Sequence, residues 1–168
     1  MGGDPAAASR AGEARGRWRD HRLSNKRGDA VGLFYAGRVR LDLVAVVVDE
    51  YDPAITFFTQ ALGFDLVEDS PSLTNDGRPK RWVVVRPPGA QTGILLARAD
   101  GEQQRAAVGG QAAGRVGFFL RVDDFDATYR RMTGAGVTFL TEPRTEPYGR
   151  VAVFLDIAGN KWDLLGPA

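Results

Sequence analysis

The sequence predicts an α+β fold made of two βαβββ units. Strand-like and helix-like stretches follow one another in the same order in both halves of the 168-residue chain. Each half ends in two runs rich in Val and Leu that are joined by a turn containing Gly, at residues 81–97 and 149–165, which is typical of a β-hairpin. A plan that occurs twice indicates two copies of one supersecondary unit.

The two halves also align at a nearly constant spacing. VDEYD at residues 48–52 matches VDDFD at residues 122–126, which lies 74 residues further on. After a one-residue gap, GFDLVED at residues 63–69 matches GVTFLTE at residues 136–142, at a spacing of 73. One face of each sheet is expected to pack on its own helix, which leaves the other face for a cover or a ligand.

The first unit is predicted to span residues 41–98. LDLVAVVV at residues 41–48 is rich in β-branched side chains and has the length of a strand. A helix follows, with Asp52 as the expected N-cap, Pro53 in the first helical position and Gly63 as the stop. The other predicted elements are a return strand, a polar loop and the hairpin, at residues 64–68, 69–80 and 81–97. A loop of this length is often a lid, and the sequence leaves open whether this one closes over a site.

A linker at residues 99–114 joins the units, and residues 115–166 repeat the first plan. The predicted elements are a strand, a helix, a return strand, a loop and the closing hairpin, at residues 115–122, 124–135, 137–141, 142–148 and 149–165. GGQAAG in the linker lacks the Lys-Ser/Thr ending of a phosphate-binding loop and does not lie between a strand and a helix. We therefore expect a turn there.

Residues 1–38 differ in composition from the rest of the chain. They hold eight Lys and Arg against four Asp and Glu, whereas acidic residues outnumber basic ones in the remainder. Their Ala, Gly and Arg show no sustained periodicity, which predicts a disordered basic N-terminal extension before one domain at residues 39–168. A basic arm can contact nucleic acid, but this composition favours a solvated tail, so no nucleic-acid partner is expected.

The composition also bears on the cellular setting. The chain has no Cys, which excludes disulfides and thiolate-metal sites and fits a reducing compartment. No apolar run reaches the roughly 18 residues of a membrane span, and the first residues lack the apolar core of a signal peptide. We therefore expect a cytoplasmic protein with no membrane partner.

Three segments carry a resemblance to a known family: VVVDEYDPAITFFTQALGF at residues 46–64, VDDFDATYRRMTGAGV at residues 122–137 and RVAVFLDIAGNKWDLL at residues 150–165. They resemble the vicinal oxygen chelate (VOC) superfamily, which includes glyoxalase I, bleomycin-resistance proteins and extradiol dioxygenases. The resemblance implies that the two units curve their sheets into a cup. In metal-using members, the first and last strands of each unit supply the ligands of one divalent ion in that cup.

Carried over to this chain, the four ligand positions are Leu43, Ile94, Gly117 and Asp163. A common form of the family's site has His and Glu there, but of these four residues only Asp163 can donate to a metal. Stable catalytic sites usually need about three protein ligands. The single His of the chain, His21, precedes both units. We therefore expect no cofactor, and a divalent metal is the alternative.

If side chains alternate between the two faces of a strand, these positions share the inner face with a mostly apolar set that includes a few polar groups. Such a lining is typical of a small-molecule pocket. The expected ligand-binding residues are Leu43, Trp82, Ile94, Arg98, Gly117, Phe119, Arg121, Tyr148 and Asp163.

Several of these residues have a structural alternative. Asp163 can pair with a neighbouring arginine such as Arg121 instead of facing a ligand. Tyr148 can orient a ligand through its hydroxyl or only fix its turn, and Trp82 can pack across a dimer contact. Trp162, in contrast, is expected to face the helices and to belong to the core.

Two functions follow from these expectations. The first is a metal-free VOC protein that binds a small organic molecule in its cup, like the drug-sequestering members of the family. The second is a VOC enzyme, either a metal-dependent lyase or dioxygenase, or one that uses Asp163 as general base and Tyr148 or an Arg to steady an oxyanion. Family members often dimerise, so the resemblance also implies a homodimer.

Overall fold

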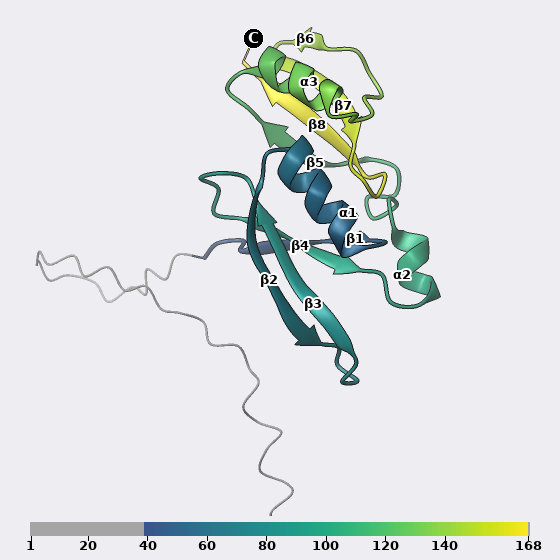
Figure 1. Cartoon of the computed structure of the whole chain (residues 1–168). Helices are drawn as coiled ribbons and strands as arrows, with labels where there is room; N and C mark the ends of the chain where they lie inside the picture. The colour runs from purple at the N-terminus through teal and green to yellow at the C-terminus, as the bar shows by residue number, and fades with distance from the viewer. Residues whose placement is uncertain (1–38, 168) are drawn as a thin grey trace, which may run out of the picture. The chain divides into compact units, whose positions relative to one another are not determined.

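The computed structural model describes residues 39–167, and the expected extension at residues 1–38 lies outside this range. The described residues form two βαβββ modules joined by a linker (Figure 1). The first module comprises β1 (Leu43–Val48), α1 (Tyr51–Thr56) with its π-helical continuation η2 (Phe57–Ala61), β2 (Asp65–Leu73), β3 (Pro79–Arg86) and β4 (Gly93–Arg98). The linker contains α2 (Glu102–Ala107). The second module comprises β5 (Val116–Arg121), α3 (Phe125–Gly134), β6 (Arg144–Glu146), β7 (Gly149–Leu155) and β8 (Lys161–Gly166).

Each module forms its own four-stranded mixed sheet. The strand orders are β1-β4-β3-β2 and β5-β8-β7-β6. In both sheets the first strand of the module is parallel to the last, and the remaining neighbours are antiparallel. The predicted α+β fold with two repeated units is therefore confirmed, and both hairpins form where the sequence predicts them.

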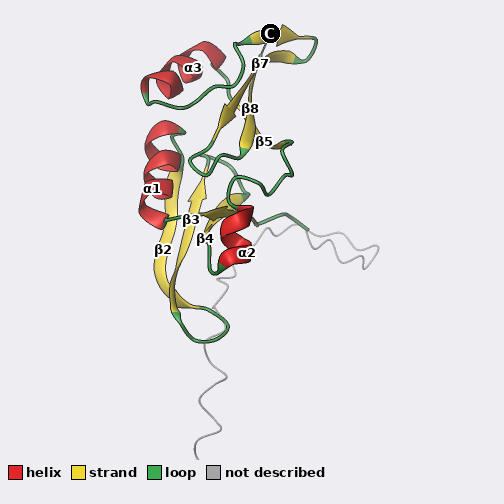
Figure 2. Cartoon of the chain, turned by 90° about the vertical axis from the view of Figure 1, so that its right-hand side faces the viewer, coloured by secondary structure: helices red, strands yellow, loops and turns green. Residues whose placement is uncertain are grey.

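The helices α1 and α3 lie on the same side of the strands, and α2 lies on the other side (Figure 2). Hydrophobic side chains from both modules form one continuous core, to which α1, η2 and α3 contribute. Trp162 on β8 is 3% exposed, and its ring centroid lies 6.0 Å from that of Phe58 in the first module. The expected core position of Trp162 is confirmed, and the two modules share one hydrophobic core.

The first helix begins earlier than predicted and changes its winding halfway. Its N-cap is Glu50, whereas Asp52, the expected cap, lies in the first turn and accepts a hydrogen bond of 2.6 Å from the Arg81 guanidinium. The chain then winds as the π-helix η2, which no feature of the sequence predicts. Gly63 follows the helix with a φ of +75°, a conformation that glycine adopts without strain, so the predicted stop is confirmed.

The segment predicted as a polar loop, residues 69–80, is mostly strand. β2 and β3 pair from Asp65 opposite Arg86 to Leu73 opposite Pro79, which leaves only residues 74–78 for the turn. The prediction was wrong because it rested on polar composition. β2 is exposed along most of its length, so its side chains need no apolar alternation to form a strand.

The return strand of the second module forms later than predicted. Residues 137–141 contain only an isolated bridge between Phe139 and Phe154, and β6 lies within the segment predicted as a loop. The hydroxyl of Thr141 accepts a hydrogen bond of 3.0 Å from the Val153 N–H. A side chain thus takes the place of a backbone partner at this point, which interrupts the ladder.

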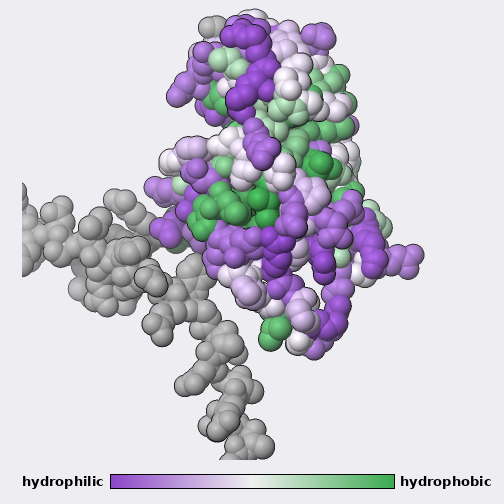
Figure 3. Space-filling view, in the orientation of Figure 1, coloured by the Kyte–Doolittle hydropathy of each residue, from purple (hydrophilic) through white to green (hydrophobic). Residues whose placement is uncertain are grey.

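The face of the described residues that Figure 3 shows is mostly hydrophilic. Figure 3 shows hydrophobic residues as separate patches, and the β2–β3 hairpin at the lower end of the view is largely hydrophilic. Within residues 39–167, no helix is both long enough and apolar enough to cross a membrane.

Candidate functional site

Each sheet has one face packed against the shared core and one open face. We call the open face the cup face, and it carries alternate residues of the strands. In the first module it includes Leu43, Ala45, Val47, Trp82, Val84, Leu95 and Ala97, and in the second Gly117, Phe119, Arg121, Val153, Asp163 and Leu165. The residues between them, such as Val46 and Leu96, belong to the core.

The cup faces contain three of the four positions that the family resemblance suggested, namely Leu43, Gly117 and Asp163. Ile94 lies on the opposite face, 8% exposed and within the core. Leu95 takes the cup-face position instead. It pairs with Ala45 on β1, and Asp163 pairs with Phe119, the residue equivalent to Ala45 on β5, so Leu95 is the counterpart of Asp163. The expected alignment of the two hairpins was displaced by one residue, and a one-residue shift in a strand exchanges its two faces.

Asp163 is partly buried on the cup face of β8. This burial raises the pKa of its carboxyl group, and the positive charge of Arg144 partly offsets the effect. The pKa of Arg144 is itself raised, mainly by its hydrogen bond to Glu146 and further by the charges of Tyr148 and Asp163. Sequence reasoning missed Arg144 because its strand was predicted as a loop. Asp163, Arg144 and Tyr148 are thus the neighbouring polar groups of the second cup face.

The other predicted residues of the second module are accessible. Phe119 is 65% exposed and Tyr148 is 60% exposed, and Arg121 is also exposed. Among the described residues, Asp163 has no ion pair within 4.0 Å, so its alternative pairing with Arg121 does not form. These side chains are free to contact a ligand.

Trp82 and Arg98 lie in the first module, Trp82 on the cup face. Arg98 was expected on the inner face but lies on the opposite one, like Ile94, because it pairs with Val48 and its guanidinium lies 5.6 Å from the centroid of the Tyr51 ring. Both Trp82 and Arg98 line a cavity of about 420 Å³ between the start of β3 and the end of β4, and all of its lining residues come from the first module and the start of the linker. Apart from Leu43 on the first cup face and Ile94 in the core, the predicted site residues therefore divide into two groups, one around Asp163 and one that lines this cavity.

The linker covers part of the cup. The Gln111 side chain lies along the free edge of β1, where its Oε1 accepts a hydrogen bond of 2.8 Å from the Val47 N–H and its Nε2 donates one of 3.2 Å to the Ala45 carbonyl. A Cβ atom placed on Gly117 would lie 3.0 Å from the Cβ of Ala112. The linker thus occupies the space that a metal-coordinating side chain at position 117 would need.

Arg86 is a second cation that sequence reasoning missed. A Cβ atom on Gly93 would lie 3.0 Å from the Leu43 side chain and 3.3 Å from Nε of Arg86, so this guanidinium lies on the cup face of the first module. Its Nε is buried without a hydrogen-bond partner in the part of the chain that the structure describes. No pattern in the sequence distinguishes Arg86 from the other strand-end arginines.

The side chains do not match the metal site of metal-using relatives. The cup-face positions equivalent to the family's ligands are held by Leu43, Leu95, Gly117 and Asp163, which offer one carboxylate. Residues 39–167 contain no group of three or more His, Cys, Asp or Glu that could hold a metal ion. One carboxylate falls short of the roughly three protein ligands of a stable catalytic site.

Comparisons with known proteins agree with this fold. A family model described as the Glyoxalase/Bleomycin resistance protein/Dioxygenase superfamily matches residues 40–164. An uncharacterized protein of Shewanella frigidimarina (strain NCIMB 400) is 49% identical over 123 residues, which are 73% of this chain and 89% of that protein.

Two solved structures are similar in both sequence and fold. UcmS2 is 33% identical with a TM-score of 0.63, and the match covers 76% of this chain and 98% of UcmS2. TnmS3, described as an antibiotic binding protein from Streptomyces sp. CB03234, is 30% identical with a TM-score of 0.61, and the match covers 80% of this chain and 100% of TnmS3.

Proposed function

Because the chain belongs to the glyoxalase/bleomycin resistance protein/dioxygenase superfamily, we propose that it binds a small organic molecule on its cup faces without a resident metal ion. The observation that carries this proposal is the composition of these faces, where apolar and aromatic side chains surround a single carboxylate and are partly exposed. Organic ligands usually bind to such surfaces. The description of the similar TnmS3 as antibiotic-binding supports a ligand of that general kind.

We further propose that the protein acts as a homodimer in which a second copy completes each cup. The argument is that Phe119, a large aromatic residue on an open sheet face, is 65% exposed. Exposed apolar surface of this kind often marks a contact with a partner. Sedimentation velocity is expected to give twice the mass of the chain, and a monomer at every concentration would refute the dimer.

A screen of aromatic and drug-like compounds by thermal shift, followed by calorimetric titration of the hits, tests the binding function. Phe119→Ala is expected to weaken binding by about fivefold or more, because it removes an aromatic contact from the cup face. Ile157→Ala is the matched control, since Ile157 is 50% exposed in the β7–β8 turn, outside the cup face. A screen without hits, or equal weakening in both variants, would contradict the proposal.

The metal content of protein purified without chelator, together with a titration of Mn²⁺, Ni²⁺, Zn²⁺, Fe²⁺ and Mg²⁺, tests the second part of the proposal. We expect far less than one ion per chain and no thermal stabilisation. About one ion per chain, with stabilisation that is lost in Asp163→Ala, would instead favour a metal-dependent lyase or dioxygenase.

An enzyme that uses Asp163 as general base is the second candidate function. The observation that favours it is the burial that raises the pKa of this carboxyl group, because a general base works best when its pKa is near the working pH. Arg144, whose charge acts on this carboxyl group, and Tyr148 would stabilise negative charge in such a reaction. A hit that the wild-type protein converts to product, and that Asp163→Asn binds without converting, would establish this function.

A further inference from the structure

β3 and β4 separate toward one end, and a cavity occupies the gap between them. β3 pairs with β2 along its whole length but with β4 only from Val83 to Val85. Figure 1 shows β2 and β3 continuing together while β4 turns away toward α2. The cavity of about 420 Å³ in this gap borders both faces of the sheet, because its lining includes Trp82 and Leu95 from the cup face and Tyr51, Leu96 and Arg98 from the helix side.

Tyr51 compensates for the missing strand contact at the inner end of the gap. Its hydroxyl donates a hydrogen bond of 3.0 Å to the Arg81 carbonyl and accepts one of 3.4 Å from the Arg81 N–H. These backbone groups of β3 would otherwise lack a partner where β4 has turned away. The separation of the strands is therefore a stable feature of the fold.

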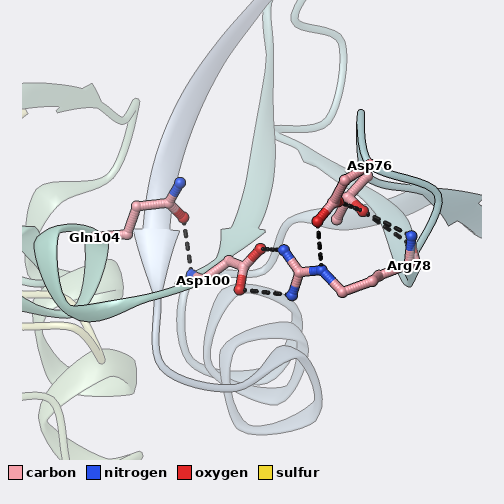
Figure 4. A network of polar contacts seen from close by, with 5 residues as sticks. Asp76, Arg78, Asp100 and Gln104 are labelled. Carbon is pink, nitrogen blue, oxygen red and sulfur yellow. Dashed lines mark hydrogen bonds and ion pairs between the residues drawn. The ribbon is translucent and has the colours of Figure 1, made fainter.

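A network of ion pairs spans the outer end of the gap (Figure 4). Arg78, in the turn between β2 and β3, donates two hydrogen bonds to the Asp100 carboxylate beyond β4, one of them 3.0 Å long. Asp76 accepts a third hydrogen bond from the same guanidinium at 2.8 Å, and Gln104 accepts one of 2.8 Å from the Asp100 N–H. The tip of the hairpin is thereby held across the mouth of the cavity.

The residues that line the cavity include more basic than acidic side chains, and carboxylates outside the lining pair with two of the cations. It contains four basic residues, Arg78, Lys80, Arg81 and Arg98, and two acidic residues, Asp76 and Asp100. Both carboxylates are engaged by Arg78. Arg81 is neutralised from outside the lining by Asp52 and Asp69.

Lys80 and Arg98 are the cations of the lining that form no hydrogen bond to a carboxylate within the described residues, and the Arg98 guanidinium lies 5.6 Å from the centroid of the Tyr51 ring. Within residues 39–167, Lys80 has no ion pair within 4.0 Å. The ion pair of Arg98 with Glu50 is 3.8 Å long and includes no hydrogen bond. Lys80 also lies two residues from Trp82 on β3, so both side chains stand on the same face of the strand.

We propose that this cavity receives the acidic group of the ligand, so that the cup selects flat aromatic molecules that carry a carboxylate or a similar anion. Lys80 and Arg98 donate charge-assisted hydrogen bonds to the anion, and the Trp82 indole packs on the ring. The inference rests on the proposed function, because it names the ligand class of the same cup.

Calorimetric titration of the full chain with three probes of the same ring tests this inference. We expect 2-naphthoate to bind at least about tenfold more tightly than the neutral 2-naphthamide, and 2-naphthylmethylammonium to bind most weakly. Lys80→Gln and Arg98→Gln should each reduce the preference for naphthoate by about threefold or more. Trp82→Leu should weaken naphthoate and naphthamide alike. Arg130→Gln, which removes an exposed cation of α3 outside the lining, is the matched control and should change nothing.

Equal affinities for naphthoate and naphthamide would overturn the anion selectivity and leave the proposed binding function intact. A preference that persists in the double variant Lys80→Gln/Arg98→Gln, shown to be folded by circular dichroism, would overturn the assignment to this cavity. If no naphthyl probe binds while the compound screen yields other hits, the ligand class is wrong. If the screen yields none either, the proposed function fails as well.

Discussion

At the scale of single residues, Asp156 shows how one buried carboxylate organises a turn. It accepts hydrogen bonds from the N–H groups of Ala158 and Asn160, at 3.0 and 2.9 Å, and from the side chains of Asn160 and Trp162, both at 3.0 Å. Asp156 is 5% exposed, so water has little access to replace these contacts. The turn between β7 and β8 is thus tied to Trp162 in the shared core.

Asp156→Asn is expected to lower the free energy of unfolding by about 2 to 3 kcal/mol, because an amide exchanges an acceptor for a donor and leaves buried N–H groups unpaired. Urea unfolding followed by Trp fluorescence measures the change. Asp65→Asn, at the exposed start of β2, is the control and should change stability by less than about 0.5 kcal/mol. Similar losses in the two variants would mean that the turn does not depend on this carboxylate.

Asp163 is expected to make the folded state less stable as the pH rises. Burial holds its pKa above the ordinary value, so the folded state binds more protons than the unfolded state between the two pKa values. The stabilising contribution is present below the unfolded pKa, about 3.9, and is lost as the pH rises through the folded one. Asp163→Asn carries a neutral side chain at every pH. Its Tm should therefore match that of the wild type near the unfolded pKa of about 3.9 and exceed it at pH 7. A variant that melts below the wild type at pH 7 would disprove this explanation.

At the scale of elements, the linker stabilises the free edge of β1. Gln111 contacts both Val47 and Ala45 with its side-chain amide, as the backbone of a neighbouring strand would. The pair of contacts joins the linker to the first module directly beside the cup face. It also explains why a segment rich in Gly and Ala keeps a defined position.

Gln111→Ala should cost about 1 kcal/mol of stability and speed the hydrogen exchange of the Val47 amide, because both edge groups of β1 lose their partner. Gln91→Ala, in the exposed loop before β4, serves as the control. Unchanged exchange at Val47 in the Gln111 variant would show that the edge is protected in another way.

At the scale of the whole molecule, the two modules share one core, so we expect them to unfold as one unit. The ring of Phe58 from the first module contacts Trp162 of the second. The guanidinium of Arg131 on α3 also donates to the carbonyls of Ala61 and Leu62, at the end of the first helix. A substitution at this contact is therefore expected to destabilise both modules.

Phe58→Ala is expected to destabilise the chain by about 3 to 5 kcal/mol, since Phe58 is 0% exposed and its loss leaves a cavity between the modules. Far-UV circular dichroism and Trp fluorescence should report one coincident transition in urea. Leu73→Ala, 62% exposed in β2, is the control with a change below about 0.5 kcal/mol. Two separate transitions would mean that the modules fold independently.

Part of the fold and part of the candidate site were predictable from the sequence. The repeat, the two hairpins, the stop at Gly63 and the core position of Trp162 follow from patterns within a few residues, and the structure confirms them. The strand β6 and the long β2–β3 hairpin did not follow from such patterns. Their residues are polar and exposed, so neither burial nor periodicity marked them.

The sequence by itself thus determined the fold class, because local hydrophobic patterns specify elements and the repeat relates the two halves, whereas the strands expected to line the cup were implied by the family resemblance. Only the tertiary structure decided which residues face the cup. The register between β1 and β4 joins segments about fifty residues apart, and it assigns Leu95 instead of Ile94 to the open face. The cavity likewise exists only because β4 leaves β3 while Arg78 and Asp100, distant in sequence, meet across the gap.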